Sequence, residues 1–485
     1  MSENSTVALK KLGLPALISG VVTSCLGSGI FNVSSTLAQG STVGVSIVSW
    51  VFVMVGIGSL SWVFTNLSRS YPELTGVTDY AYQGSGKLAA ASSGISYFVS
   101  GFCGNLAFLI MLAQSFSIFS RYVPYLHHFE QGNSPQTLIF ISLFSWILTF
   151  SVIKFGAEKV AGFNTIVTIF KVGALAVFII FGVILFQSGI FTAHFWQRIS
   201  DNSGTLTFSK MTFNSFMGQF GSGLFSMIFL FVGIESASML GNRAEKKSDV
   251  GKATMLGTIV LFFLYFVISM LPFGMLSQQQ LATLKQPGLV YVVETTVGPI
   301  GGALMSIALI ITLLGALLSW FLLPVEPLQR LAEQGIFPKW MGNTNKVGSP
   351  VGSLIFTQIL LQALIASLIF TNSAYEFSLS LCTVTIVISY FFVGVFQFKV
   401  GLSKRDSKII IPGLIVILFE IIAVAVSGLH YLALSTLVLV LGFIFYTYTV
   451  GLKNIKKSEW LMIAITTIIA VGTIIALLTG MMSIQ

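Results

Sequence analysis

The chain has 485 residues, of which 55% are hydrophobic and only 8% charged, and its mean hydropathy is +0.91. Soluble domains carry roughly 25% charged residues, so this composition excludes a soluble protein and predicts an all-α protein embedded in a lipid bilayer. The net charge of +9 is explained by basic connections on one side of the membrane, and no nucleic-acid partner is expected.

A hydropathy window of about 19 residues predicts thirteen membrane spans. They lie at 12–37, 44–65, 90–118, 136–153, 161–187, 218–241, 254–276, 298–328, 351–371, 375–398, 409–428, 431–450 and 459–481. We expect a cytoplasmic N-terminus (1–11), a first repeat of five spans (12–187), an external loop (188–217), a second repeat of five spans (218–398) and three C-terminal spans (399–485). The break at 427–431 is the weakest of these boundaries.

The positive-inside rule orients the chain. With the N-terminus, which carries Lys10 and Lys11, in the cytoplasm, most Lys and Arg residues of the connections face inward. The exceptions, expected outside, are Arg121, Arg198, Lys210 and Lys285. Because thirteen is odd, the C-terminus is then expected outside, and the protein is expected to be a multi-pass protein of the cell membrane.

Two spans contain residues that interrupt a helix in mid-membrane. The first span holds "CLGSGIF" (25–31) and the sixth holds "FLFVGIESAS" (229–238). Irregular backbone at membrane depth is tolerated only where it is buried in protein or lines a cavity. These are the first helices of two consecutive five-span units, which therefore have opposite orientations, and this arrangement predicts an inverted-repeat transporter with its site at the breaks.

The broken helices offer free backbone groups for an α-amino acid. N–H groups at a half-helix N-terminus favour a carboxylate, and those expected to do so are Ser28, Gly29 and Ile30. Freed carbonyls can accept an ammonium group, and the expected ones belong to Cys25, Phe229 and Val232. We therefore expect a small amino acid or amine as the substrate.

Four ionisable residues lie inside predicted spans, where each costs about 3 kcal/mol. Lys171 is either a structural ammonium on broken-helix carbonyls, a fixed cation in place of a coupling sodium, or a proton carrier. Glu235 is expected to anchor the sixth-span break or to act in gating, and Glu420, outside the ten-span core, to serve packing or the lipid interface. The fourth is Glu326.

The remaining reactive residues argue against other classes of membrane protein. The three cysteines lie in apolar stretches without metal-binding spacing, and the four histidines fall at predicted outer loops without the HExxH pattern of a metalloenzyme. We expect neither an enzyme nor a cofactor. A channel is the other alternative, and substrate counterflow distinguishes it from a carrier.

Several of these motifs resemble a known family. "GSGIF", "GIESAS", Lys171 and "RLAEQGIFPKW" (330–340) resemble the amino acid–polyamine–organocation transporters over essentially the whole chain. The closer resemblance is to the basic amino acid/polyamine antiporters, and within them to the arginine/ornithine antiporters. It is carried by "NRAEKKSDVGKAT" (242–254), "FNTIVTIFKV" (163–172), "YPELTGVTDYAY" (71–82) and "GALLSWFLLPVE" (315–326).

This resemblance implies a LeuT-like five-plus-five inverted repeat with about three additional C-terminal helices, and sodium-independent exchange by alternating access. It also implies that Ser28 and Gly29 bind the substrate carboxylate. The side-chain pocket and gates it implies are Tyr97, near the outer gate, Asn105, Phe229, Trp320, Cys382 and Tyr390. The protein would be a monomer or a homodimer.

Glu326 follows Trp320 by six residues, as a Glu does in this subgroup. On a continuous helix this spacing is about 600° of rotation and roughly 9 Å of rise, which puts Glu326 on the cytoplasmic side of Trp320, between Pro324 and Pro327. Two readings stay open: Glu326 binds a cationic substrate side chain while Trp320 adds a cation–π contact, or it pairs with Arg330 at the inner interface.

Two departures from the family pattern bear on the substrate. Phe229 stands where related antiporters often carry Trp, and "NVSS" (32–35) stands where a Pro-bearing stretch is usual. Arginine/ornithine exchange is the first candidate. Exchange of histidine for histamine, exchange of another amino acid for its decarboxylation product, and proton-coupled uptake are the alternatives.

Overall fold

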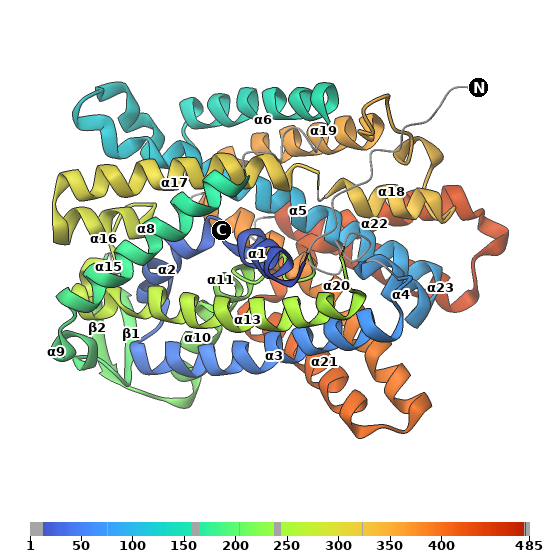
Figure 1. Ribbon diagram of the computed structural model, residues 1–485, viewed down its shortest axis with the longest axis horizontal. Coiled ribbons are helices and arrows are strands. Elements are labelled where there is room, and N and C mark those ends of the chain that lie inside the picture. Colours follow the sequence, from blue (N-terminus) through green and yellow to red (C-terminus); the bar gives the residue numbers. More distant parts are fainter. Residues whose placement is uncertain are drawn as a thin grey trace.

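The computed structural model describes residues 13–74, 76–156, 164–202, 204–236, 244–322, 324–371, 373–479 and 481. Within them, ten helices are long and apolar enough to cross a membrane. They are α3 (Val43–Ser70), α5 (Lys87–Ser115), α6 (Pro135–Phe155), α13 (Lys247–Met270), α17 (Pro299–Trp320), α19 (Val351–Ser367), α20 (Ala374–Lys404), α21 (Ser407–Ser427), α22 (Leu429–Val450) and α23 (Lys457–Leu478). The bundle is therefore the expected all-α membrane architecture (Figure 1).

The other three predicted spans are shorter or interrupted, so the count of thirteen stays a prediction. The first is divided into α1 (Leu14–Cys25), the 3₁₀ turn η1 (Gly29–Phe31) and α2 (Val33–Gly40). The sixth consists of α10 (Phe213–Ser222), α11 (Leu224–Phe229) and a run of turns to Glu235. The fifth is α8 (Asn164–Leu185). Both predicted helix breaks are present; the end of the second, with Ala237 and Ser238, lies outside the described residues, as does the N-terminus with Lys10 and Lys11.

The eighth span ends earlier than predicted. Instead of one helix to residue 328, α17 ends at Trp320 and a separate helix, α18 (Val325–Glu333), follows. Pro324 and Pro327 lack the N–H groups that a continuous helix needs, so the rotation inferred for Glu326 along a single helix is wrong. The weakest predicted boundary is confirmed, since α21 ends at Ser427 and α22 begins at Leu429 around Gly428, whose φ is 152°.

The connecting segments gather at two ends of the bundle. At one end, hereafter the hairpin end, lie η2 (Ser117–Arg121), η3 (Pro124–Glu130), α9 (Ser188–Thr192), α14 (Pro272–Met275), α15 (Gln278–Ala282), α16 (Gly288–Val297), η7 (Leu368–Phe370) and an antiparallel hairpin of β1 (Gln197–Asn202) and β2 (Thr205–Lys210), which the sequence did not predict (Figure 1). At the opposite end, the α4 end, lie α4 (Val77–Ser85), α18, η6 (Lys339–Met341) and η8 (Leu452–Asn454). The four basic residues expected outside all lie at the hairpin end. The orientation itself remains a prediction.

The centre of the bundle is α5, whose residues are all buried except Lys87 at its start. Glycines let its neighbours approach closely, as is common between membrane helices. A Cβ at Gly101 would lie 2.5 Å from Pro324, and one at Gly94 would lie 2.5 Å from Leu331. The start of α18 is thus packed directly on α5, beside the helix breaks.

Candidate substrate site

The first break presents unpaired backbone donors. After α1 ends at Cys25, the N–H groups of Ser28, Gly29 and Ile30 form no hydrogen bond with any residue that the structure describes. All three residues are buried. Buried N–H groups are rarely left without an acceptor, so these three donors, hereafter the carboxylate cradle, are available for the carboxylate that the sequence predicts there.

The second break lies against the first. Gly233 has a φ of 108°, and a Cβ there would lie 2.7 Å from Ser24 Oγ and 3.2 Å from the Trp320 ring. Glycine is therefore required for the close approach of the two backbones. Of the carbonyls expected to accept an ammonium group, those of Cys25 and Phe229 each already accept one backbone N–H, from Gly27 at 2.8 Å and Val232 at 3.1 Å. The Val232 carbonyl accepts none from the described residues.

Aromatic rings close the space between the breaks. A Cβ at Gly29 would lie 2.8 Å from the Phe229 ring, and Phe108 packs edge-on against both Phe229 and Trp320, with ring centroids 6.4 and 5.8 Å apart. The cavity left among them is about 10 Å³, the room of about one water molecule. Its lining is Ser24, Cys25, Gly27, Gly29, Phe108, Phe229, Leu230, Val232 and Trp320. An amino acid can enter only when these rings move.

Asn105 and Trp320 hold the end of α17 at this cavity. The Trp320 indole donates to the Ser24 carbonyl at 3.1 Å, and Asn105 Nδ2 donates to the Trp320 carbonyl at 3.1 Å. Asn105 Oδ1 is buried and accepts no hydrogen bond from the described residues. This oxygen is a free acceptor for a substrate donor, beside the cavity rather than in its lining.

Besides Asn105 and Glu326, the expected pocket residues Tyr97, Cys382 and Tyr390 lie outside the cavity lining. Cys382 Sγ lies 3.2 Å from Ser100 Oγ. Tyr390 instead donates a 2.6 Å hydrogen bond to Glu235, whose other carboxylate oxygen accepts one of 2.6 Å from Tyr97. Glu235 is 0% exposed, and a carboxylate this deeply buried needs such donors. The three side chains tie the second break to α5 and α20.

The position of Tyr97 along α5 is defined by its neighbours. It lies in the part of α5 nearer Lys87, close to Gly94, which contacts Leu331 of α18. The cluster of Tyr97, Glu235 and Tyr390 is therefore on the side of the breaks toward the α4 end, and the place of Tyr97 near the outer gate stays a prediction.

Lys171 reaches the first break from α8. Its ammonium group donates to the Leu26 carbonyl and, at 3.3 Å, to the Thr23 carbonyl, and its side chain is buried. Cations near the C-terminus of a helix stabilise its free carbonyls. This is the geometry of a structural ammonium that fixes the end of α1.

Glu326 does not form the ion pair with Arg330 that one of its two readings expected. It is exposed in the first turn of α18 and forms no hydrogen bond or ion pair with the residues that the structure describes. Arg330 pairs with Asp79 of α4 instead, through two bonds of 2.9 Å. These bonds raise the pKa of the Arg330 guanidinium. The sequence missed Asp79 because 251 residues separate it from its partner.

Similarity to known proteins agrees with this geometry. The family model for amino acid permeases matches residues 12–469. The chain belongs to the amino acid permease family. It is 40% identical over 446 residues to the arginine/ornithine antiporter ArcD1 of Lactococcus lactis subsp. cremoris, a match that covers 90% of this chain and 84% of the relative. It is 39% identical over 478 residues to the arginine/ornithine antiporter of Latilactobacillus sakei, covering 96% of each.

The permease also shares its fold with a solved structure. The crystal structure of MhsT in complex with L-phenylalanine aligns with 85% of this chain and 98% of its own, with a TM-score of 0.60 at 16% identity. This similarity shows the LeuT-like fold of the permease.

Sequence reasoning missed the residues on the hairpin side of the site. Tyr375, in the first turn of α20, shares a 3.2 Å hydrogen bond with Ser28 Oγ. The neighbouring Glu376 accepts hydrogen bonds from Asn32 at 3.0 Å and Thr36 at 2.9 Å. These contacts fix α2 of the permease to α20. Asn32 belongs to the unusual "NVSS" stretch, but nothing local predicted its partner.

Glu420 is buried in α21, and neither carboxylate oxygen has a hydrogen-bond partner among the described residues. Of the two roles expected for it, this placement agrees with packing within the permease and not with the lipid interface.

Proposed function

We propose that this permease is a cationic amino acid antiporter of the cell membrane that exchanges arginine for ornithine. The observation that carries the proposal is that, among the described residues, the N–H groups of Ser28, Gly29 and Ile30 have no acceptor and the Val232 carbonyl has no donor, while Gly29 and Val232 line one small cavity. These groups match the carboxylate and the ammonium group of an α-amino acid. The names of the two relatives above, and that of ArcD2 of Lactococcus lactis at 38% identity over 97% of this chain, support the arginine/ornithine pair.

A cationic side chain has suitable partners beyond this backbone site. The rings of Trp320, Phe229 and Phe108 can attract a guanidinium or ammonium group, by about 2 kcal/mol when the site is desolvated. Asn105 Oδ1 offers an acceptor next to them. We propose that these residues, rather than the exposed Glu326, receive the substrate side chain.

Alternating access follows from closures on both sides of the site. Toward the α4 end, Tyr97 and Tyr390 hold Glu235; toward the hairpin end, Tyr375 holds Ser28. We propose that one closure opens at a time around the loaded site. Arginine and ornithine both carry one positive charge, so their exchange moves no net charge across the membrane potential.

A second substrate pair has specific support. The permease is 31% identical over 92% of its length to the arginine/agmatine antiporter of Chlamydia abortus. Agmatine lacks the carboxylate and carries an additional net positive charge, so this exchange would move charge and respond to membrane potential. Exchange of histidine for histamine has no comparable support.

The test is uptake of labelled arginine by proteoliposomes loaded with ornithine, agmatine, histamine, lysine or buffer. We expect uptake only with an internal exchange partner, greatest with ornithine and insensitive to an imposed membrane potential. Equal uptake into buffer-loaded vesicles, driven by a pH gradient, would establish proton-coupled uptake and overturn the exchange mechanism.

A further inference from the structure

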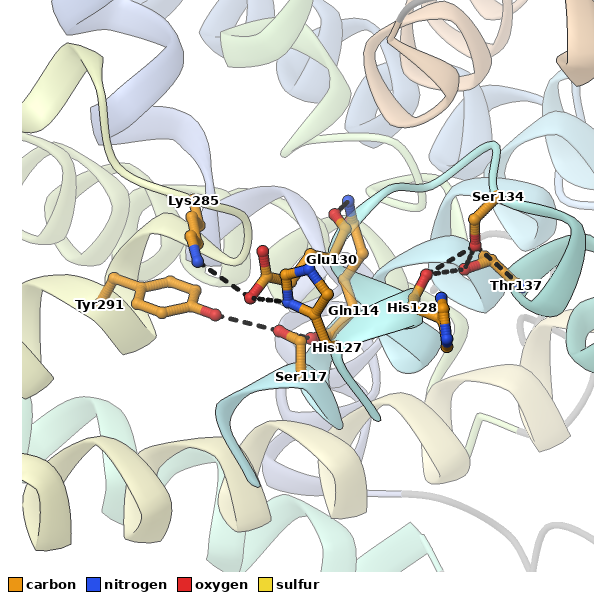
Figure 2. A network of polar contacts seen from close by, with 9 residues as sticks. All are labelled: Gln114, Ser117, His127, His128, Glu130, Ser134, Thr137, Lys285 and Tyr291. Carbon is orange, nitrogen blue, oxygen red and sulfur yellow. Dashed lines mark hydrogen bonds and ion pairs between the residues drawn. The ribbon is translucent and has the colours of Figure 1, made fainter. Parts of the chain in front are cut away.

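Figure 2 shows a network of polar contacts at the hairpin end that includes Glu130, Lys285 and His127. Two cavities are lined by residues of this network. Glu130 and Lys285 line both of them. The first cavity, of about 620 Å³, is also lined by Arg121 and Glu294, which pair with each other. The second, of about 520 Å³, is also lined by Gln114 and Tyr375. Either is far larger than the closed cavity between the helix breaks.

Glu130 is the acidic centre of this cluster. Its Oε1 atom lies 2.9 Å from the Lys285 ammonium and 3.2 Å from His127 Nδ1. Its Oε2 atom pairs with none of the residues that the structure describes. Only 17% of the Glu130 side chain is exposed, so this carboxylate retains acceptor capacity in a partly desolvated place, where a further charged hydrogen bond is strong.

Gln114 supplies an independent sign of a ligand. It is 4% exposed, and its Oε1 atom has no hydrogen-bond partner among the described residues. Its Nε2 atom donates to the Glu130 main-chain carbonyl at 3.3 Å, which holds the amide beside Glu130 (Figure 2). Buried acceptors without a donor are uncommon in native proteins. The second cavity is thus lined by two side chains that each have one acceptor oxygen without a donor among the described residues.

The second cavity also adjoins the route to the helix breaks. Tyr375 lines it, and the hydroxyl group of the same residue is hydrogen-bonded to Ser28. A ligand in this cavity would therefore be separated from the carboxylate cradle by the Tyr375 side chain.

We propose that the second cavity is a docking site for the cationic amino acid on the outer face, a step before the central site; this inference rests on the proposed function. The guanidinium or ammonium group of the substrate binds Glu130 and Gln114 Oε1. A guanidinium group binds a carboxylate through both oxygens, so the substrate displaces Lys285 from Glu130. Lys285 is an internal competitor for the site.

Because Lys285 competes with the substrate for Glu130, substitution of either member of this ion pair should change the KM for outer arginine in opposite directions. Glu130→Gln removes the acceptor and should raise the KM for outer arginine about tenfold, the effect of one charge-assisted hydrogen bond. Lys285→Met removes the competitor and should lower that KM. Gln114→Leu removes an acceptor without changing charge and should raise it about threefold. A purely structural ion pair would be broken equally by the first two substitutions.

The measurement is the initial rate of labelled arginine entry into ornithine-loaded cells, at increasing outer arginine. Glu294→Gln is the matched control, because Glu294 lines the first cavity but not the second. We expect the KM of this variant for outer arginine to stay within about twofold of the wild-type value. Shifts in the same direction for Glu130→Gln and Lys285→Met, or no shift in either, would overturn the docking site.

Binding of labelled arginine to the purified variants separates this inference from the proposed function. Opposite shifts in Kd for Glu130→Gln and Lys285→Met, in a protein that does not exchange arginine, would support the docking site and overturn the proposed function. Arginine/ornithine exchange by the wild-type protein, together with equal shifts in Kd for the two variants, would support the proposed function and overturn the docking site.

Discussion

Tyr375 and Ser28 share a hydrogen bond of 3.2 Å although 347 residues separate them. One lies at the start of α20 and the other in the break of the first span. The bond joins a residue that lines the second cavity to the carboxylate cradle. We propose that substrate arriving from the hairpin end reaches the cradle only when this contact opens.

Removal of this contact should make the central site more accessible from the hairpin end. Tyr375→Phe deletes one hydrogen bond of about 1 kcal/mol, which corresponds to about fivefold in the population of the open form. Cys25, buried in the first break, reports this opening by its rate of reaction with a membrane-impermeant thiol reagent, in a variant that lacks Cys103 and Cys382. An unchanged rate would show that Tyr375 does not close the site.

The two tyrosines that hold Glu235 should stabilise the protein. Tyr97→Phe or Tyr390→Phe removes a donor from a buried carboxylate, at a cost of about 1–3 kcal/mol, and should lower Tm and the exchange rate. Tyr265→Phe is the matched control, because the Tyr265 hydroxyl is also buried but has no partner among the described residues. Equal losses in the three variants would contradict a specific role for the cluster.

Lys171 should be required for substrate binding. Lys171→Met removes the ammonium that donates to the carbonyls of Thr23 and Leu26, and the end of α1 that precedes the cradle should lose its fixed position. We expect binding of labelled arginine to the purified protein to weaken by at least about tenfold. Wild-type binding by this variant, at normal protein yield, would show that the ammonium does not support the break.

Glu326 should not determine selectivity. Because its side chain is exposed and does not line the cavity, Glu326→Gln should preserve the preference for arginine over a neutral amino acid of similar size. The measurement is competition by both ligands against labelled arginine uptake. Loss of this preference would indicate that Glu326 binds the cationic side chain of the substrate.

The sequence predicted the local features of the site well. Glycines and serines in apolar runs marked both helix breaks, and the deep Lys171 was expected to meet broken-helix carbonyls, as it does. The sequence missed two kinds of feature: contacts between residues far apart in the chain, and a residue whose type is so common that its position carries no signal. Tyr375, Glu376 and Asp79 bind residues hundreds of positions away, and Phe108 is one of 43 phenylalanines. The end of α17 could have been predicted from Pro324, but the hydropathy window extended the predicted span across this proline.

The most direct test of the account is the stoichiometry of exchange. Proteoliposomes loaded with labelled ornithine are diluted into buffer with or without arginine, and ornithine exit and arginine entry are counted together. The account predicts little exit without arginine, and one ornithine released for each arginine that enters. Ornithine exit that is as fast without external arginine as with it would contradict an antiporter.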